Sequence, residues 1–138
     1  MKLQNKYKMR LEHTALTITD QAEVQDFYCN VLGMNEIRSF VLSKDLAGQI
    51  FGINEDTSVF QLQNENIFLE LFLVPEKHDR SFEHICISAN DREILVSKAE
   101  KKGYPCIRIE REHSDLLFIK DKSGNIFEIK ENQVHTLD

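Results

Sequence analysis

The alternation of apolar and polar residues predicts a strand near the start of the chain, followed by a helix. Along Leu11–Ile18 the odd positions share one strand face and the even positions share the other. Apolar residues then recur at helical spacing, at Val24, Phe27, Tyr28, Val31 and Leu32. Asp20 and Glu23 have the form of a capping box before this helix, and Gly33 provides a C-terminal stop. The chain therefore opens with a strand and an amphipathic helix.

The next segment predicts three more strands and a short helix. We expect a strand over Met34–Leu42, a short helix over Ser43–Gly52, and hairpin strands over Ser58–Leu62 and Asn66–Val74 with a turn at Gln63–Glu65. On the last strand Glu70 lies between Phe68 and Phe72 on one face, and the opposite face is aliphatic. A carboxylate in the middle of such a strand is costly to bury without a partner. Glu70 is therefore a candidate functional residue.

The second half of the chain repeats the first, which identifies an internal duplication. Leu11–Thr17 reads L-E-H-T-A-L-T and Phe82–Ser88 reads F-E-H-I-C-I-S, with the histidines 71 residues apart (84 minus 13). Each half also closes on a shared phrase, N-I-F-L-E-L at Asn66–Leu71 and N-I-F-E-I at Asn125–Ile129. Each half thus contributes one histidine early and one glutamate late.

The second half predicts the same order of elements. We expect a strand at Phe82–Ser88, a helix capped by Asn90 and Glu93 and ending near Lys102, strands at Cys106–Glu110 and Leu116–Lys120, a turn at Asp121–Asn125, and a last strand at Ile126–Lys130. The His-to-Glu spacing is 57 in the first half and 44 in the second, which indicates that the helix near residues 43–54 is an insertion. The prediction is one domain over residues 10–131, made of two βαβββ units (about 10–75 and 81–131), with a lead-in at 1–9 and a tail at 132–138.

Composition and charge argue against a nucleic-acid-binding, membrane or secreted protein. The chain has 138 residues, enough for one domain with a real core, and 41% of them are hydrophobic. A formal charge of −6 argues against binding to nucleic acid or to an anionic membrane. The apolar runs are too short to span a bilayer, and the N-terminus lacks the apolar region of a signal peptide. Three cysteines, Cys29, Cys86 and Cys106, indicate free thiols in a reducing cytoplasm. We expect a cytoplasmic protein with a small-molecule partner.

Four residues at equivalent places in the two repeats form a candidate metal site: His13, Glu70, His84 and Glu128. Imidazoles and carboxylates together suit a divalent ion such as Zn, Ni, Co, Fe or Mn. Four protein ligands on an octahedral ion leave two positions for substrate, as a catalytic site requires. A single strand histidine or glutamate is more often an ordinary polar residue, but the repetition favours metal binding. Arg38 is either an anchor for an anionic substrate or a surface charge.

Two longer motifs carry a family resemblance. D-F-Y-C-N-V-L-G-M at Asp26–Met34 and D-K-S-G-N-I-F-E-I at Asp121–Ile129 resemble the first helix and the final turn and strand of the vicinal oxygen chelate superfamily. The resemblance implies an α+β fold in which the two units form a curved, mostly antiparallel eight-stranded sheet around a central metal site. It places His13 beside Glu70 and His84 beside Glu128, and it is compatible with a homodimer.

The ligand set His, Glu, His, Glu is similar to that of bacterial glyoxalase I. This resemblance implies a lyase or isomerase that uses one divalent ion (Ni, Zn or Co, with Fe or Mn as alternatives) and takes Glu128 or Glu70 as its base. Two positions depart from the glyoxalase I pattern, because Thr17 and Val74 stand where an arginine and an asparagine would contact glutathione. The alternatives are a metal-dependent epimerase or dioxygenase of the same superfamily, or a non-catalytic module that sequesters a ligand.

Overall fold

The computed structural model describes residues 11–76 and 82–132. The elements follow in the order β1 (Thr14–Ile18), η2 (Val24–Cys29), β2 (Asn35–Leu42), α1 (Lys44–Phe51), β3 (Thr57–Asn64), β4 (Ile67–Leu73), β5 (Ile85–Ala89), α2 (Arg92–Lys101), β6 (Cys106–Ile109), β7 (Leu116–Lys120) and β8 (Ile126–Glu131). This order confirms two βαβββ units, with α1 as an extra helix in the first. The predicted lead-in (1–9) and nearly all of the predicted tail lie outside the described residues.

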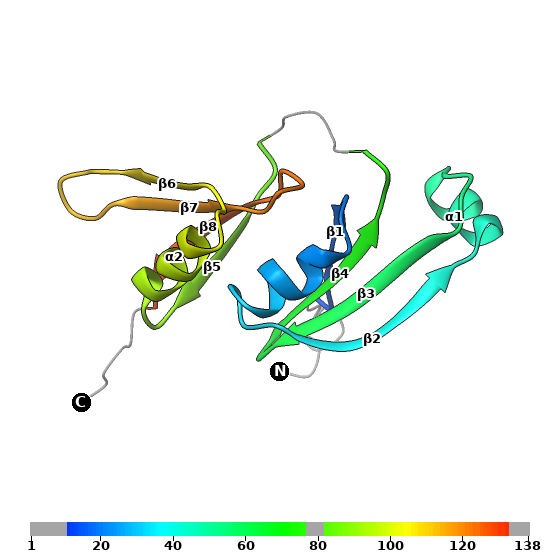
Figure 1. Ribbon diagram of the computed structural model, residues 1–138, viewed down its shortest axis with the longest axis horizontal. Helices are drawn as coiled ribbons and strands as arrows, with labels where there is room; N and C mark the ends of the chain where they lie inside the picture. Colours follow the sequence, from blue (N-terminus) through cyan, green and yellow to red (C-terminus); the bar gives the residue numbers. More distant parts are fainter. Residues whose placement is uncertain (1–10, 77–81, 133–138) are drawn as a thin grey trace, which may run out of the picture.

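The eight strands are divided between two four-stranded sheets, in the orders β1-β4-β3-β2 and β5-β8-β7-β6. In each sheet the first and last strands of the unit are parallel neighbours, and the other two pairings are antiparallel. The tandem α+β architecture is confirmed, but the strands do not form one continuous eight-stranded sheet. Figure 1 shows the two sheets side by side, with the first-unit helix between them and α1 at the far end of the first sheet. Side-chain contacts, rather than strand pairing, therefore join the units.

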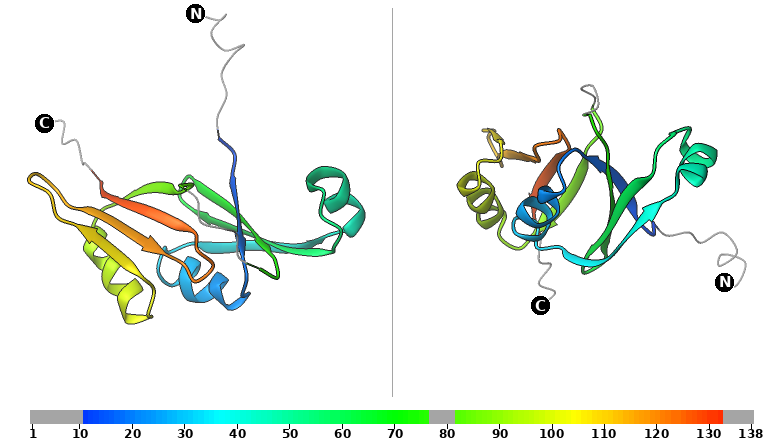
Figure 2. Two further views of the ribbon diagram at one scale, coloured as in Figure 1. Left: turned by 90° about the horizontal axis from the view of Figure 1, so that it is seen from above. Right: turned by 45° about the vertical axis from the view of Figure 1, so that its right-hand side comes forward.

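The core is built around η2, which contacts both sheets. Phe27 and Tyr28 are fully buried, and the Phe27 ring centroid lies 4.8 Å from that of Tyr104 and 5.7 Å from that of Phe127. The apolar positions predicted for the first helix, Val24, Phe27, Tyr28, Val31 and Leu32, are all buried, although η2 ends at Cys29 and the last two lie in the turn that follows. The same cluster includes Leu62 and Leu71 of the first sheet and Ile119 and Phe127 of the second. Figure 2 shows the helix in this intermediate position from two further directions.

The start of η2 differs from the predicted capping box. The Asp20 carboxylate accepts a hydrogen bond from the Ala22 N–H (2.9 Å), as expected of a residue that begins a helix. Glu23, which is 2% exposed, instead accepts hydrogen bonds from the Lys122 N–H and the Ser123 hydroxyl of the second unit. The capping-box assignment of Glu23 is therefore wrong. The Glu23 carboxylate binds residues of the second unit instead of the backbone at the start of its own helix.

The turn at Asp121–Asn125 forms hydrogen bonds between the second unit and the first. The Thr19 N–H donates to the Ser123 hydroxyl (2.9 Å), and the Asn125 side-chain amide donates to the Thr17 carbonyl (2.7 Å). The buried Tyr28 hydroxyl donates to the Asp121 carboxylate (2.8 Å). Burial raises the pKa of the carboxyl groups of Glu23 and Asp121, although their hydrogen bonds partly oppose it. We call this turn and its first-unit partners the inter-unit latch.

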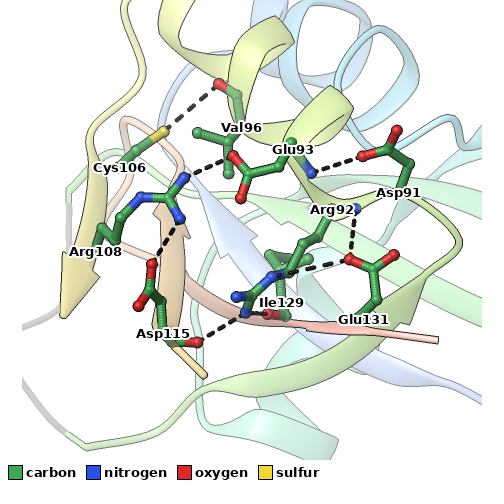
Figure 3. A network of polar contacts seen from close by, with 9 residues as sticks. All are labelled: Asp91, Arg92, Glu93, Val96, Cys106, Arg108, Asp115, Ile129 and Glu131. Carbon is green, nitrogen blue, oxygen red and sulfur yellow. Dashed lines mark hydrogen bonds and ion pairs between the residues drawn. The ribbon is translucent and has the colours of Figure 1, made fainter. Parts of the chain in front are cut away.

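The helix α2 is held against the second sheet by arginines. Asp91, and not Asn90 as predicted, caps the helix by accepting from the Glu93 N–H. Figure 3 shows Arg108 of β6 between the carboxylates of Glu93 (2.6 Å) and Asp115 (3.1 Å), and Arg92 donating to the Asp115 carbonyl (2.9 Å). The Glu93 carboxylate thus forms an ion pair with Arg108 and does not form the predicted capping box. This network fixes the outer layer of the second unit.

The inserted helix α1 begins and ends as predicted. The Ser43 hydroxyl accepts from the Leu46 N–H, and Gly52 ends the helix in the left-handed conformation (φ 72°). Ala47 is buried, whereas Leu46, Ile50 and Phe51 are all about half exposed. The Phe51 ring makes an edge contact with Phe72 of β4 (centroids 5.7 Å apart). Through this contact α1 covers one end of the face of the first sheet that carries Glu70.

The β3–β4 hairpin turns later along the chain than predicted. The strands extend to Asn64 and resume at Ile67, so that the turn lies at Glu65–Asn66, and Glu65 has a positive φ of 53°. The resulting register pairs Gln61 with Glu70 and Val59 with Phe72. A turn centred at Asn64, as predicted, would have paired Glu70 with a residue near Ser58. The register therefore decides which side chain stands opposite the candidate ligand.

Candidate metal centre

The first predicted pair is formed where β1 and β4 lie side by side. His13 immediately precedes β1, and the parallel register sets Ala15 opposite Glu70. The His13 Nε2 atom lies 3.4 Å from Oε1 of Glu70. The histidine side chain is 49% exposed and the glutamate 15% exposed. The prediction that these two residues are neighbours is confirmed.

The second pair repeats this arrangement in the other sheet. Cys86 lies opposite Glu128 in the parallel register of β5 and β8, and the His84 Nε2 atom lies 3.5 Å from Oε1 of Glu128. The His84 Nδ1 atom is 2.9 Å from the Phe82 carbonyl, which can only accept a hydrogen bond. In the neutral ring this contact places the proton on Nδ1, so the Nε2 lone pair faces the carboxylate.

The donor geometry of each pair fits a divalent ion. Two adjacent ligands bound at about 2.1 Å, at an angle between 90° and 110°, are about 3.0 to 3.4 Å apart. The observed nitrogen–oxygen separations of 3.4 and 3.5 Å are close to this range. An imidazole lone pair and a carboxylate oxygen facing each other repel unless a cation or a proton lies between them. Each pair could therefore supply two of the ligands of a divalent ion.

The two pairs are not brought together within one chain. Among residues 11–76 and 82–132, no group of three or more His, Cys, Asp and Glu side chains is placed to hold a metal ion. Two hollows, of about 590 and 500 Å³, lie beside α1 and at the end of β4, and none of the four residues lines either of them. Each unit thus presents one His–Glu pair on its sheet, which we call a half-site. The expected central site of four ligands is not present within the described part of a single chain.

Gln61 is a site residue that the sequence pattern did not reveal. Its side-chain amide donates to Oε2 of Glu70 at 2.6 Å, which leaves Oε1 directed at His13. Glu128 has no such support among the described residues, where its one polar contact is with His84. A correct hairpin register would have found Gln61, because it pairs directly with Glu70. The two glutamates therefore differ, because Glu70 contacts both His13 and Gln61, whereas Glu128 contacts only His84 among the described residues.

The residues around the pairs are mainly apolar. Phe68 and Phe72 flank Glu70 on its strand face, and Phe118 lies opposite Glu128 with its ring centroid 6.5 Å from that of His84. Partial burial and, secondarily, the charge of Glu128 raise the pKa of the Cys86 thiol. A raised pKa makes this thiol less reactive as a nucleophile. All three cysteines are free, as predicted.

Comparison with known proteins identifies the family. The sequence profile described as the Glyoxalase/Bleomycin resistance protein/Dioxygenase superfamily matches residues 10–129. This chain belongs to that superfamily. No curated protein matches the sequence. The predicted family resemblance is confirmed.

Solved structures share the fold over almost the whole chain. A mutant of the fosfomycin resistance protein FosX from Listeria monocytogenes, complexed with Mn(II) and 1S,2S-dihydroxypropylphosphonic acid, has a TM-score of 0.72 at 13% identity, covering 92% of this chain and 95% of that one. The trypanothione-dependent glyoxalase I of Leishmania major has a TM-score of 0.69 at 25% identity, covering 90% and 87%. A glyoxalase family protein from Bacillus cereus has a TM-score of 0.71 at 17% identity, covering 91% and 96%. No helix among the described residues is long and apolar enough to cross a membrane.

Proposed function

We propose that this protein is a divalent-metal-dependent lyase or isomerase that moves a proton on a carbon next to a carbonyl of a small oxygenated substrate. The observation that carries this proposal is the pair of His–Glu contacts, His13 with Glu70 and His84 with Glu128, at equivalent places in the two repeats. The superfamily relatives support it, because FosX is complexed with Mn(II) and the Leishmania protein is a glyoxalase I. Ni, Zn or Co is the expected ion, with Fe or Mn as alternatives.

The metal centre is proposed to form between two copies of the chain. Each copy offers one half-site on the first sheet and one on the second, and neither is completed within the copy. A two-fold axis that sets the first sheet of one copy against the second sheet of the other would create two identical four-ligand centres. Ile107 and Ile109 lie on the same face of the second sheet as Glu128 and are 38% and 47% exposed, respectively. A dimer interface on this face would cover both side chains. A homodimer with one ion per chain follows.

The two glutamates are proposed to have different roles. A divalent ion held by the four residues would polarise a substrate carbonyl and so favour loss of a proton from the adjacent carbon. Gln61 keeps Glu70 oriented as a ligand through its 2.6 Å hydrogen bond. Glu128 is 17% exposed and lies beside Phe118, so it can turn toward a substrate carbon and accept the proton on a carboxylate oxygen in a largely apolar environment. We therefore assign Glu128 as the base.

Glutathione is not part of the proposed substrate. Thr17 and Val74 stand where glyoxalase I enzymes would provide a charged and an amide contact. The Thr17 carbonyl is already used by Asn125 of the inter-unit latch. Loss of a charged donor from a carboxylate site weakens binding strongly. A different small carbonyl compound is the expected substrate.

A complementation experiment tests the shared metal centre. One variant carries His13→Ala and Glu70→Ala, and the other carries His84→Ala and Glu128→Ala. Each alone should bind no tightly held ion, because every centre in either homodimer lacks one pair. After co-expression, random pairing makes about half of the dimers mixed, each with one intact centre, so the mixture should hold about a quarter of the wild-type metal.

The control variant is His113→Ala with Glu100→Ala, which removes the same residue types from exposed positions outside both pairs. It should keep the full metal content of about one ion per chain, measured by elemental analysis after desalting. A mixture that recovers no metal while the wild type is loaded would contradict the shared centre. Wild-type protein that takes up no Ni, Co or Zn would instead favour a metal-free module that sequesters a ligand.

A further inference from the structure

Arg38 lies on the same sheet face as Glu70 because of an irregularity in β2. Asn35 pairs with Gln63 and Glu36 with Leu62, but the register then shifts so that Arg38 pairs with Gln61. The extra residue, Ile37, reverses the alternation of side chains along the rest of the strand. Without this β-bulge Arg38 would point to the core face. The bulge therefore places Arg38 on the sheet face that carries Glu70.

The first sheet carries a row of residues that runs from the metal pair to this arginine. Ala15, Glu70, Gln61 and Arg38 are consecutive partners across the four strands. Two strand spacings separate Arg38 from Glu70, which is about 9 to 10 Å between their Cα atoms. An arginine side chain and a short substrate can span this distance together. The row thus places Arg38 at a distance from Glu70 that a short substrate bound to the metal could bridge.

Arg38 has no anionic partner among the described residues. Its guanidinium lies over the Phe40 ring, 4.9 Å from the centroid. Arg92 and Arg108, in contrast, are both in ion pairs with carboxylates of the second unit. In the described strands β1 to β4, Arg38 is the one lysine or arginine on the sheet face that carries Glu70. Stacking on Phe40 orients the guanidinium fork while its N–H donors stay free to bind an anion.

We propose that Arg38 is the specificity residue for a distal anionic group of the substrate, a carboxylate or a phosphate-like group. This inference rests on the proposed metal function, since the substrate's chelating oxygens must be held near Glu70. The substrate class is then a short carbonyl or hydroxy-carbonyl compound with two neighbouring oxygens at one end and an anion at the other. The planar guanidinium binds such an anion through two parallel hydrogen bonds.

Binding of two matched chelators to the Ni-loaded protein tests this assignment. The probes are the monohydroxamate of succinic acid, whose hydroxamate supplies neighbouring oxygens and whose far end is a carboxylate, and the same molecule with a neutral carboxamide at the far end. Calorimetry should show that the wild type binds the carboxylate probe at least about tenfold more tightly than the carboxamide. Arg38→Gln should lose this preference and still bind the carboxamide as the wild type does.

Two further variants sharpen the result. Arg38→Lys should keep part of the preference, because the charge remains while the two-pronged geometry is lost. Lys101→Gln, at the exposed C-terminal end of α2, changes the net charge equally and should leave the preference intact. If Arg38→Gln retains the preference, or if the wild type has none while both probes bind, the assignment of Arg38 is wrong and the metal centre stands. If neither probe binds and the protein takes up no metal, the proposed function itself fails, and this inference with it.

Discussion

Replacement of Tyr28 by phenylalanine removes one hydrogen bond of the inter-unit latch and leaves the core packing intact. The hydroxyl donates to Asp121 at 2.8 Å, and both residues are almost fully buried. A hydrogen bond to a charged group contributes about 1.5 to 3 kcal/mol. The carboxylate oxygen that Tyr28 contacts also accepts from the Asn125 amide (2.8 Å), so it is not left without a donor. We therefore expect the free energy of unfolding to fall by about 1.5 to 2 kcal/mol at neutral pH.

The loss should depend on pH in a defined direction. Burial raises the pKa of Asp121 above its ordinary value, and the hydrogen bonds from Asn125 and Tyr28 lower it in part. Removal of the Tyr28 hydroxyl should raise this pKa further. A carboxyl with a raised folded-state pKa destabilises the fold above that pKa, and this penalty disappears as the pH falls toward the ordinary carboxyl range. The difference between wild type and variant should therefore shrink on acidification to the value of a neutral hydrogen bond, about 0.5 to 1.5 kcal/mol.

Urea unfolding at fixed protein concentration measures both effects. The matched control is Tyr104→Phe, which removes a hydroxyl from the same aromatic cluster but removes no hydrogen bond to a carboxylate of the described residues. Burial and nearby carboxylates raise the pKa of Tyr104 to about 12, so its hydroxyl stays protonated throughout the titration. The control should lose less than about 0.5 kcal/mol. A Tyr28→Phe variant that loses no more than the control, or whose loss does not change with pH, would refute the reasoning about the latch.

The remaining predictions concern the proposed chemistry. Glu128→Gln should retain metal and lose turnover by at least about a hundredfold, the lower range for a general base, in a steady-state assay with metal content measured in parallel. Equal turnover of Glu128→Gln and wild type would rule out Glu128 as the base. Activity should persist without oxygen and be supported by Ni, Co or Zn, whereas strict dependence on Fe(II) and O₂ would indicate a dioxygenase. The hemithioacetal of methylglyoxal and glutathione should be turned over weakly, with kcat/KM below about 10⁴ M⁻¹s⁻¹ by thioester absorbance; a higher value would show that Thr17 and Val74 do not exclude glutathione.

Both sequence and structure agree on the pairing of His13 with Glu70 and of His84 with Glu128. The repeat located the four residues, and the superfamily resemblance placed the first and last strands of each unit side by side. The structure confirms this arrangement through the parallel registers of β1 with β4 and of β5 with β8. Each pair joins only neighbouring strands of one unit. Such contacts depend on the fold of the unit alone, and the repeated pattern carries that information.

Period-two and helical patterns in the sequence also identified the elements and the buried positions of the first helix. These patterns are local, because they reflect which side of a strand or helix meets the core. The caps were less well determined. Glu23 and Glu93 both fit a capping box, but their carboxylates bind Ser123 and Arg108 instead. A cap contributes about 1 kcal/mol, so a long-range partner of similar strength can replace it.

Only the tertiary structure decided the features that distinguish the two half-sites. The hairpin register places Gln61 on Glu70, and the β-bulge turns Arg38 onto the same face, although neither is visible in the hydrophobic pattern. A one-residue change in register leaves composition and spacing unchanged but moves every side chain of a strand to the opposite face. The division of the strands into two sheets, with η2 between them, likewise depends on how the units pack. The sequence determined which residues form each His–Glu pair, because that contact lies within one unit; the separation of the pairs was decided by packing between units, which no local pattern encodes.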